Sequence, residues 1–202
     1  SWNLMAWGFS TGEGQMGGWT FKPAAMLCQE AACVIALGGA FQIYNQPQRN
    51  GHLTGWHQDI MAEVARFVRA RQAWCRDSES VPQAAVLHAA SHFHAVTGEA
   101  ILSKWSGAQT PVVGALHALL ENGCHVDIVN EDGLLADLAA YKLVVVPEQT
   151  HLPQHLVDAL TAYAEAGGRV LLAGANVAAD FGALAGVAPA GEPIDGHFFL
   201  QV

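Results

Sequence analysis

Four short apolar segments alternate with helical patterns in the second half of the chain, and this alternation constrains the fold more than any other feature. Each segment has five residues and is rich in valine, leucine or alanine; the four are residues 84–88, 125–129, 142–146 and 169–173. Strands that are apolar on both faces are typical of parallel sheets covered by helices on both sides. Because crossovers between parallel strands are right-handed, the sequence predicts a doubly wound, flavodoxin-like α/β domain.

The segments between these strands carry helix start and stop signals. Thr110 is a cap residue and Pro111 suits a first turn, in a helix that we expect to end at residues 122–123. Pro153 likewise starts a helix that ends at residues 167–168, which are both glycine. The apolar stripe of this second helix is formed by Leu156, Leu160 and Tyr163.

The first half of the chain repeats the order strand, loop, helix twice. The segments 2–9 and 40–44 are apolar and aromatic enough for strands. Pro23 starts one predicted helix, which ends at a glycine pair, and a second helical pattern begins at Trp56. These two strand–helix units precede the flavodoxin-like part of the chain.

A polar stretch separates the two halves. Hydrophobic periodicity stops at residues 76–80 and restarts after Pro82. We therefore expect two domains, residues 1–77 and residues 78–202. Five of the six tryptophans precede this boundary, so the halves also differ in composition.

Composition and charge exclude several classes of partner. The chain carries 18 acidic and 9 basic side chains, a net charge of −9, and no run of Lys or Arg, so we expect no nucleic-acid ligand. The longest apolar stretch, residues 31–41, is shorter than the ~20 residues that span a bilayer. We therefore expect a soluble protein that binds no membrane and no cofactor, located in the cytoplasm or the periplasm.

The loop after the first strand of the second half offers a possible metal site. His92 and His94 are two residues apart, a spacing that places both side chains on one side of an extended loop, and Glu99 follows nearby. The alternative is a polar loop tip, because ten histidines are spread over the chain. The four cysteines are scattered without a metal-binding spacing, and we expect them to be reduced thiols.

The loops that follow the other strands lack the residues of a nucleophilic enzyme. A nucleophile elbow needs Ser or Cys at the turn from strand to helix, and residues 173–176 after the fourth strand provide Gly174 and Ala175. The loop after the first strand has no glycine pattern to cradle a phosphate. The second domain is therefore predicted to be a scaffold with its catalytic positions empty.

The second half resembles a known family in three runs of sequence. Residues 141–147, 160–168 and 169–172 are similar to the β-galactosidase trimerisation domain of family 42 glycoside hydrolases. That domain is itself similar to class I glutamine amidotransferases. The resemblance implies that the amidotransferase nucleophile would stand near Gly174 and the oxyanion loop at residues 147–148, where this chain has Pro and Glu. An active amidotransferase is not expected.

The first half resembles the end of a glycosidase (β/α)8 barrel of the α-L-fucosidase or β-galactosidase type. The resemblance is carried by residues 2–9, 22–23, 29–32 and 38–44, and it implies that the two strands are the seventh and eighth of the barrel. Chemistry in such barrels lies at the carboxyl ends of the strands, where sugar rings stack on aromatic side chains. The residues that this places at the substrate cleft are Trp7, Glu13, Tyr44, Asn45 and Gln46.

The alternative for Trp7 and Tyr44 is that they pack in the core. A glycosidase needs two carboxylates that flank the scissile bond, and only Glu13 is a candidate from this segment. Because two strands of eight cannot enclose a substrate, we expect the isolated chain to have no glycosidase activity.

The preferred hypothesis is a C-terminal fragment of a glycoside hydrolase, whose amidotransferase-like domain is non-catalytic and serves packing or oligomerisation. Carbohydrate would be bound by the full-length parent, and the chain itself is expected to form a homo-oligomer. Two alternatives stay open. One is a free-standing amidotransferase-like or metal-dependent hydrolase that uses His92 and His94, and the other is a sugar-binding module without turnover.

Overall fold

The chain forms two compact units in the computed structural model, residues 1–80 (unit 1) and residues 81–202 (unit 2). The structure describes residues 2–11, 19–98, 109–188 and 190–191. The candidate residues Glu13 and Glu99 lie outside these ranges.

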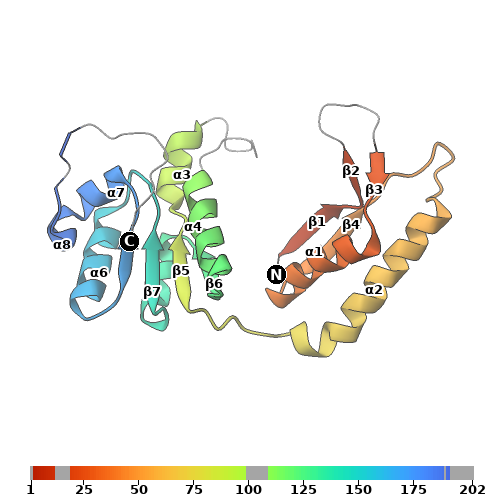
Figure 1. Cartoon of the computed structure of the whole chain (residues 1–202), viewed down its shortest axis with the longest axis horizontal. Coiled ribbons are helices and arrows are strands. Elements are labelled where there is room, and N and C mark those ends of the chain that lie inside the picture. Colours follow the sequence, from red (N-terminus) through yellow and green to blue (C-terminus); the bar gives the residue numbers. More distant parts are fainter. Residues whose placement is uncertain (1, 12–18, 99–108, 189, 192–202) are drawn as a thin grey trace. The chain divides into compact units, whose positions relative to one another are not determined.

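Unit 1 is built on two parallel strands and two helices (Figure 1). Its elements in chain order are β1 (Asn3–Trp7), β2 (Phe9–Thr11), β3 (Trp19–Phe21), α1 (Ala24–Ala36), β4 (Ala40–Tyr44) and α2 (Gly55–Cys75). β1 and β4 are paired in parallel, with Asn3 opposite Ala40 and Trp7 opposite Tyr44. The predicted strand–helix–strand–helix order is therefore confirmed for this unit.

One face of the β1–β4 pair is covered by the helices. Leu27 and Ala31 of α1 and Val64 of α2 are buried together, and Phe41 and Ile43 of β4 pack against them. Successive residues of a strand point to opposite faces, so Gln42 and Tyr44 lie on the other face of β4, and both are exposed.

A short hairpin interrupts the segment that we predicted as one strand, residues 2–9. The backbone turns after Trp7, and β2 pairs antiparallel with β3, with Phe9 opposite Phe21. Gly8 allows this turn because a Cβ there would overlap the Phe21 ring, 2.8 Å from its tip. The apolar run continues through the turn to Phe9, which is why the sequence pattern did not reveal it.

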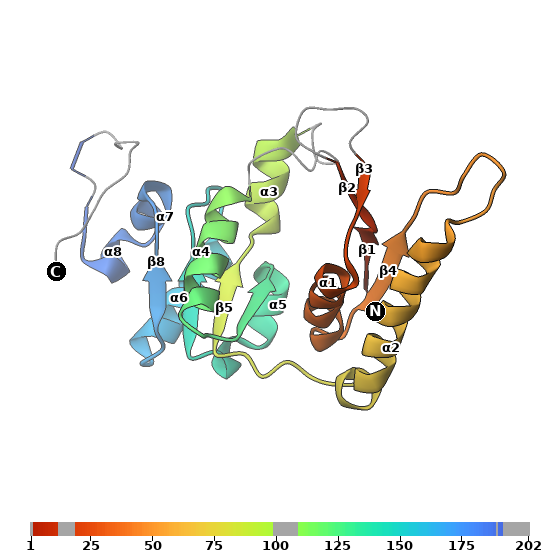
Figure 2. The ribbon, with the colours of Figure 1, turned by 45° about the vertical axis from the view of Figure 1, so that its right-hand side comes forward.

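Unit 2 contains a four-stranded sheet in which every neighbouring pair is parallel and the strand order is β6-β5-β7-β8 (Figure 2). Its elements in chain order are β5 (Ala84–Leu87), α3 (Ala90–Thr97), α4 (Thr110–Glu121), β6 (Val126–Val129), α5 (Glu131–Ala136), η2 (Leu138–Ala140), β7 (Leu143–Val146), α6 (Gln154–Glu165), β8 (Val170–Leu172), α7 (Ala175–Asp180) and α8 (Gly182–Ala185). The predicted α/β class is confirmed, and all four predicted strands are present.

Helices cover the two faces of this sheet unequally. On one face, Val86, Val126 and Val145 are buried under Val112 of α4. On the other face, a larger core gathers buried side chains of the strands and of α5, α6 and α7; its largest members are Phe181, Leu87, Leu134, Leu156 and Leu160. The predicted stripe on α6 is confirmed, and its Tyr163 hydroxyl also donates to the Tyr141 carbonyl oxygen at 2.8 Å.

Two local predictions in unit 2 were wrong. The loop 88–94, expected to be extended, instead runs into helix α3, which begins at Ala90. The N-cap of α4 is Gln109 rather than Thr110, which is the first helical residue. Neither N-cap, Ala89 or Gln109, makes a side-chain capping hydrogen bond, so the sequence carried no capping signal at either helix start.

Within the described ranges, no helix has the length and apolar character needed to cross a membrane.

We predict that Leu160→Ala lowers the free energy of unfolding of unit 2 by about 2–5 kcal/mol, because it leaves a cavity in the larger core. Leu160 has no exposed surface. The measurement is urea denaturation followed by circular dichroism. Glu165→Ala, at an exposed position of the same helix, is the control and should change the value by less than about 0.5 kcal/mol.

Candidate functional site

The carboxyl ends of β5 and β7 are tied together by one buried amide. Gln149, in the loop after β7, is 1% exposed. Its Oε1 accepts a hydrogen bond from the Ala89 backbone N–H at 2.6 Å, and its Nε2 donates to the carbonyl oxygens of Leu87 and Pro147 at 3.0 and 3.3 Å. Ligands of doubly wound sheets bind at this edge, so the hydrogen bonds of Gln149 hold the backbone that would surround any site here.

A buried carboxylate holds the start of α3. Glu131, at the start of α5, accepts hydrogen bonds from the backbone N–H groups of Ala90 and Ser91 at 2.8 and 2.9 Å and from the Ser91 hydroxyl at 2.7 Å. Burial raises the pKa of Glu131, but these hydrogen bonds outweigh that effect and lower it below its usual value. The Ser91 hydroxyl is therefore engaged in a structural hydrogen bond to Glu131.

We predict that Glu131→Gln destabilises unit 2 at pH 7 by about 1–3 kcal/mol, since a charged acceptor is lost from buried donors. The pKa of Glu131 is lower in the folded than in the unfolded state. Its contribution is therefore present above the unfolded pKa of about 4.5 and is lost as the pH falls through the folded value.

Urea denaturation between pH 3 and pH 7 measures this, and the difference between wild type and Glu131→Gln should shrink below about pH 4.5. The neighbouring exposed residue gives a matched control, Asp132→Asn, which should differ from wild type by less than about 0.5 kcal/mol at pH 7. A difference for Glu131→Gln that stays constant with pH contradicts the assignment.

The histidines of the predicted metal site lie on α3. A helix places residues two apart about 200° around its axis, so His92 and His94 do not share a side as the extended loop would have required. His92 is partly buried, whereas His94 is exposed. The described residues contain no group of three or more His, Cys, Asp or Glu side chains that could hold a metal ion. Because Glu99 lies outside those residues, the metal site stays a prediction.

His92 acts instead as a hydrogen-bond acceptor. Its Nδ1 accepts from the Thr150 backbone N–H at 2.9 Å, and the Thr150 hydroxyl lies 3.1 Å from the same nitrogen. Burial lowers the pKa of His92, and the nearby His151 and His88 act in the same direction. A neutral imidazole with an unprotonated Nδ1 fits both the lowered pKa and the bond from Thr150.

The turn after β8 contains no nucleophile and is filled by a carboxylate. Gly174, at the start of α7, has φ 128° and ψ 160°, a conformation that only glycine adopts readily. A Cβ at this position would overlap the carboxylate of Glu148, which lies over the turn. Both oxygens of Glu148 accept from the Asn176 backbone N–H at 3.2 Å, and the Asn176 side-chain amide donates to Oε1. The space beside Gly174 is therefore occupied by the protein itself.

We predict that Gly174→Ala lowers the free energy of unfolding by roughly 2–5 kcal/mol, from the unfavourable backbone conformation and the displaced Glu148 hydrogen bonds. Adding Glu148→Ala should recover part of this loss, because it removes the carboxylate but leaves the Glu148 Cβ at 2.7 Å.

Gly186→Ala separates the two causes. Gly186 also has a positive φ, 64°, but a Cβ there has nothing within 4 Å, so we expect a loss of only about 1–2 kcal/mol. Equal losses for Gly174→Ala and Gly186→Ala in urea denaturation would show that Glu148 does not fill the turn.

In unit 1, the predicted cleft residues gather at the carboxyl ends of β1 and β4. The Trp7 and Tyr44 rings have centroids 6.5 Å apart, and both contact the buried Phe9 ring at 5.3 and 5.9 Å. Trp7 and Tyr44 each have more than two fifths of their surface exposed, so they are only partly buried in the core. Asn45 and Gln46 follow directly after β4, and Gln46 is exposed.

Among the described residues, two buried polar atoms at this end of unit 1 find no hydrogen-bond partner: Asn45 Nδ2 and His57 Nδ1. The His57 ring stacks on Phe21 at 3.9 Å, and burial lowers its pKa. Sequence reasoning singled out Asn45 but missed His57, because His57 lies in the first turn of α2 and reaches the site through a ring stack that no sequence spacing reveals.

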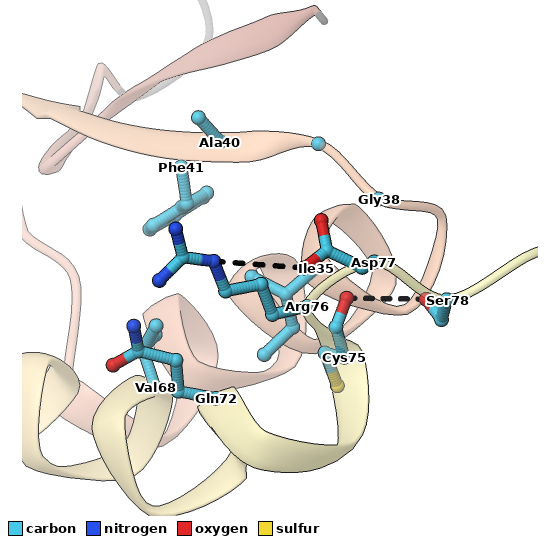
Figure 3. A pocket seen from close by; sticks show the side chains of 11 residues that line it. Ile35, Gly38, Ala40, Phe41, Val68, Gln72, Cys75, Arg76, Asp77 and Ser78 are labelled. Carbon is cyan, nitrogen blue, oxygen red and sulfur yellow. Dashed lines mark hydrogen bonds and ion pairs between the residues drawn. The ribbon is translucent and has the colours of Figure 1, made fainter.

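The pocket shown in Figure 3 lies at the opposite, amino end of β4 and measures about 540 Å³. Phe41, Val68 and Ile35 form its apolar wall, and Arg76 and Asp77 stand at its edge as an exposed ion pair 3.9 Å apart. Of the predicted cleft residues, the four that the structure describes, Trp7, Tyr44, Asn45 and Gln46, do not line this pocket. Because barrel chemistry lies at the carboxyl ends of strands, the pocket is no candidate for it.

Residues 82–180 match the family of the β-galactosidase trimerisation domain. Among solved structures, α-L-fucosidase isoenzyme 2 from Paenibacillus thiaminolyticus is similar with a TM-score of 0.63 and 26% identity, over 83% of this chain and 24% of that one. That share of this chain is larger than unit 2 alone, so the likeness extends into unit 1.

Two β-galactosidases also match. The enzyme from the Antarctic haloarchaeon Halorubrum lacusprofundi has a TM-score of 0.52 and 22% identity over 80% of this chain and 25% of that one, which shows a shared fold. The enzyme from Bifidobacterium adolescentis has a TM-score of 0.41 and 25% identity over 54% of both chains. Among curated proteins, no sequence matches the chain. The chain spans about a quarter of the fucosidase.

Fold and site together define part of a modular α/β protein, with a strand–helix unit followed by a doubly wound unit that has no nucleophile at the turn after β8. Within this class, residues 82–180 of unit 2 match the β-galactosidase trimerisation domain family, and the chain is similar in structure to an α-L-fucosidase. The resemblance inferred from the sequence is thus confirmed. The more distant likeness to glutamine amidotransferases stays a prediction.

Proposed function

We propose that this chain is a part of a glycoside hydrolase in which unit 2 is a non-catalytic assembly domain. The observation that carries the proposal is the turn at Gly174, where a glycine stands in place of a nucleophile and the Glu148 carboxylate fills the space beside it. A Cβ at residue 174 would overlap this carboxylate, so the side chain of a serine or cysteine nucleophile does not fit there. Two further hydroxyls stand at this sheet edge: that of Ser91 donates to Glu131, and that of Thr150 lies within hydrogen-bond distance of the His92 and His151 rings.

Unit 1 supplies two strand–helix units of a (β/α)8 barrel in this proposal. Its two parallel strands have helices on one face, and the other face carries Met5 and Trp7 with 54% and 44% of their surface exposed. In a barrel, the face away from the helices points to the interior, where side chains of neighbouring strands cover it. Among the described residues, β1 and β4 pair only with each other, as strands awaiting further neighbours do.

The substrate of the parent protein is proposed to be a carbohydrate, bound at the carboxyl ends of these strands. Trp7 and Tyr44 offer partly exposed rings on which a sugar can stack, and the unpartnered Asn45 amide offers a donor for a sugar hydroxyl. Gln46 adds an exposed amide beside them. Catalytic carboxylates from other strands complete the reaction in this proposal, so the isolated chain is inactive.

Assembly is the function proposed for the chain itself. The family that matches residues 82–180 is described as a trimerisation domain, and we propose that unit 2 brings copies of the protein together. The expected result of light scattering coupled to size-exclusion chromatography is a mass well above the 21.4 kDa of one chain, rising toward three times that value with concentration.

The same preparation tests the non-catalytic role. Incubation with glutamine should release ammonia no faster than buffer alone. A mass that stays at 21.4 kDa up to high concentration contradicts the assembly role, and ammonia release above the buffer rate contradicts the non-catalytic one.

A further inference from the structure

We infer that the loop between β7 and α6, residues 147–153, is held to helix α3 by a hydrogen bond that opens when the pH falls. The bond runs from the Thr150 backbone N–H to Nδ1 of His92, 2.9 Å away. β5, which leads into α3, and β7 are neighbouring parallel strands, so the contact joins the two segments that follow them. The inference does not depend on the assembly role proposed above.

This hydrogen bond requires a neutral imidazole. A neutral ring has one nitrogen that accepts, whereas an imidazolium carries a hydrogen on both nitrogens and accepts nothing. A protonated His92 would therefore set its own Nδ1–H against the Thr150 N–H, with two donors 2.9 Å apart. A backbone N–H cannot become an acceptor, so one of the two groups has to move away from the other.

The Thr150 hydroxyl does not share this restriction. It lies 3.1 Å from Nδ1 of His92 and 2.8 Å from Nδ1 of His151. A hydroxyl either donates or accepts, so it can turn to suit a neutral or a protonated ring. The effect of protonating His92 therefore falls on the backbone of residue 150 and not on its side chain.

The surroundings of His92 oppose its protonation. Burial lowers the pKa of His92, and the imidazoles of His151, in the same loop as Thr150, and of His88, in the segment after β5, act in the same direction. The bond from Thr150 also favours the neutral ring, because only that form can accept it. Among the described residues, no group of side chains that could hold a metal ion includes His92.

Two carboxylates lie close to this cluster of imidazoles, and both are already engaged. Glu148 favours a charge on His92, but its oxygens are bound by Asn176. Glu131 of α5 accepts hydrogen bonds from the backbone and hydroxyl of Ser91 at the start of α3. Neither carboxylate makes a printed ion pair with the ring in the part of the chain that the structure describes, so a protonated His92 has no partner ready for its charge.

The opening is limited to the outer part of the loop. Gln149 keeps its buried hydrogen bonds to Ala89 and Leu87, and these do not titrate. His151, two residues further on, is exposed and has φ 61°, a left-handed conformation that is uncommon for a residue with a side chain. Residues 150 and 151 can therefore leave α3 while Gln149 stays in place.

The position of the contact gives the opening a consequence for binding. In the strand order β6-β5-β7-β8, the chain passes from β5 to one side of the sheet and from β7 to the other. This is the topological switch point, where ligands of doubly wound sheets bind. Access to this edge of unit 2 should therefore be greater at low pH.

NMR spectroscopy of the full chain between about pH 8 and pH 5, with EDTA present, follows both partners of the bond. The pKa of His92 is lower in the folded than in the unfolded state, so the contact is complete above the usual value of 6.5 and is lost as the pH falls through the folded value. We expect the Thr150 amide to shift with the midpoint of the His92 ring and not with that of the His151 ring.

Hydrogen exchange gives the size of the effect. After correction for the intrinsic dependence of exchange on pH, the protection of the Thr150 amide should fall at least about tenfold across the transition. The Ala89 amide, which donates to Gln149, is the internal reference and should keep its protection.

Two substitutions of His92 separate the acceptor from the charge. In His92→Asn, an amide oxygen attached to Cγ takes the place of Nδ1, so it can accept from Thr150 but does not titrate, and the protection should stay at every pH. His92→Phe removes the acceptor, and the Thr150 amide should be unprotected throughout. The matched control is His94→Asn, at an exposed position of the same helix, which should keep the wild-type transition.

The wild-type titration decides the matter even if a variant does not fold. A Thr150 amide that stays protected while the His92 ring titrates overturns the inference. A ring midpoint at or above 6.5, or a ring that stays neutral down to pH 5, overturns it as well. A loss of protection in His92→Asn with the wild-type midpoint would show that another group opens the contact, which also contradicts the role of His92.

Discussion

The three hydrogen bonds of the buried Gln149 amide hold the carboxyl edge of the unit 2 sheet in place. One side chain joins the end of β5, the N-cap residue of α3 and the loop after β7, and it uses a donor and an acceptor that have no access to water. Glu131 holds the start of α3 beside this amide, since it accepts hydrogen bonds from the next two backbone N–H groups, those of Ala90 and Ser91. The polar groups at the edge where ligands of such sheets bind are therefore engaged with one another.

At the neighbouring strand β8, a side chain likewise occupies the space at the carboxyl edge of the sheet. At the end of β8, the Glu148 carboxylate reaches over Gly174 to the start of α7 and occupies the volume beside the turn. A carboxylate here repels the oxyanion that an acyl-transfer reaction would have to stabilise. Empty catalytic positions and a negative charge in the same turn support one reading of unit 2, in which the sheet serves as a framework for contacts elsewhere on its surface.

Sequence patterns were sufficient for the elements whose hydrophobic period is regular. The strands at 84–88 and 142–146 were found to within one residue, since each is apolar on both faces, and α6 was found from its stripe and its proline. The β2–β3 hairpin and helix α3 were not predicted, because neither segment has a clear hydrophobic period or a capping residue. The contacts of Gln149, Glu131 and Glu148 could not be predicted at all, because they join residues 28 to 62 positions apart through side-chain geometry.

The two units have in common that side chains typical of an interior stay exposed on one face. In unit 1 these are Met5 and Trp7, on the strand face that the helices leave uncovered, and in unit 2 they are Val113 and Leu120 on α4. Exposed apolar surface of this extent is costly in water, at about 25 cal/mol for each Å², so contiguous examples mark places of contact. The kind of contact differs. Unpaired strand edges are suited to pairing with further strands of the same sheet, whereas an exposed helix side is suited to packing against a preformed surface.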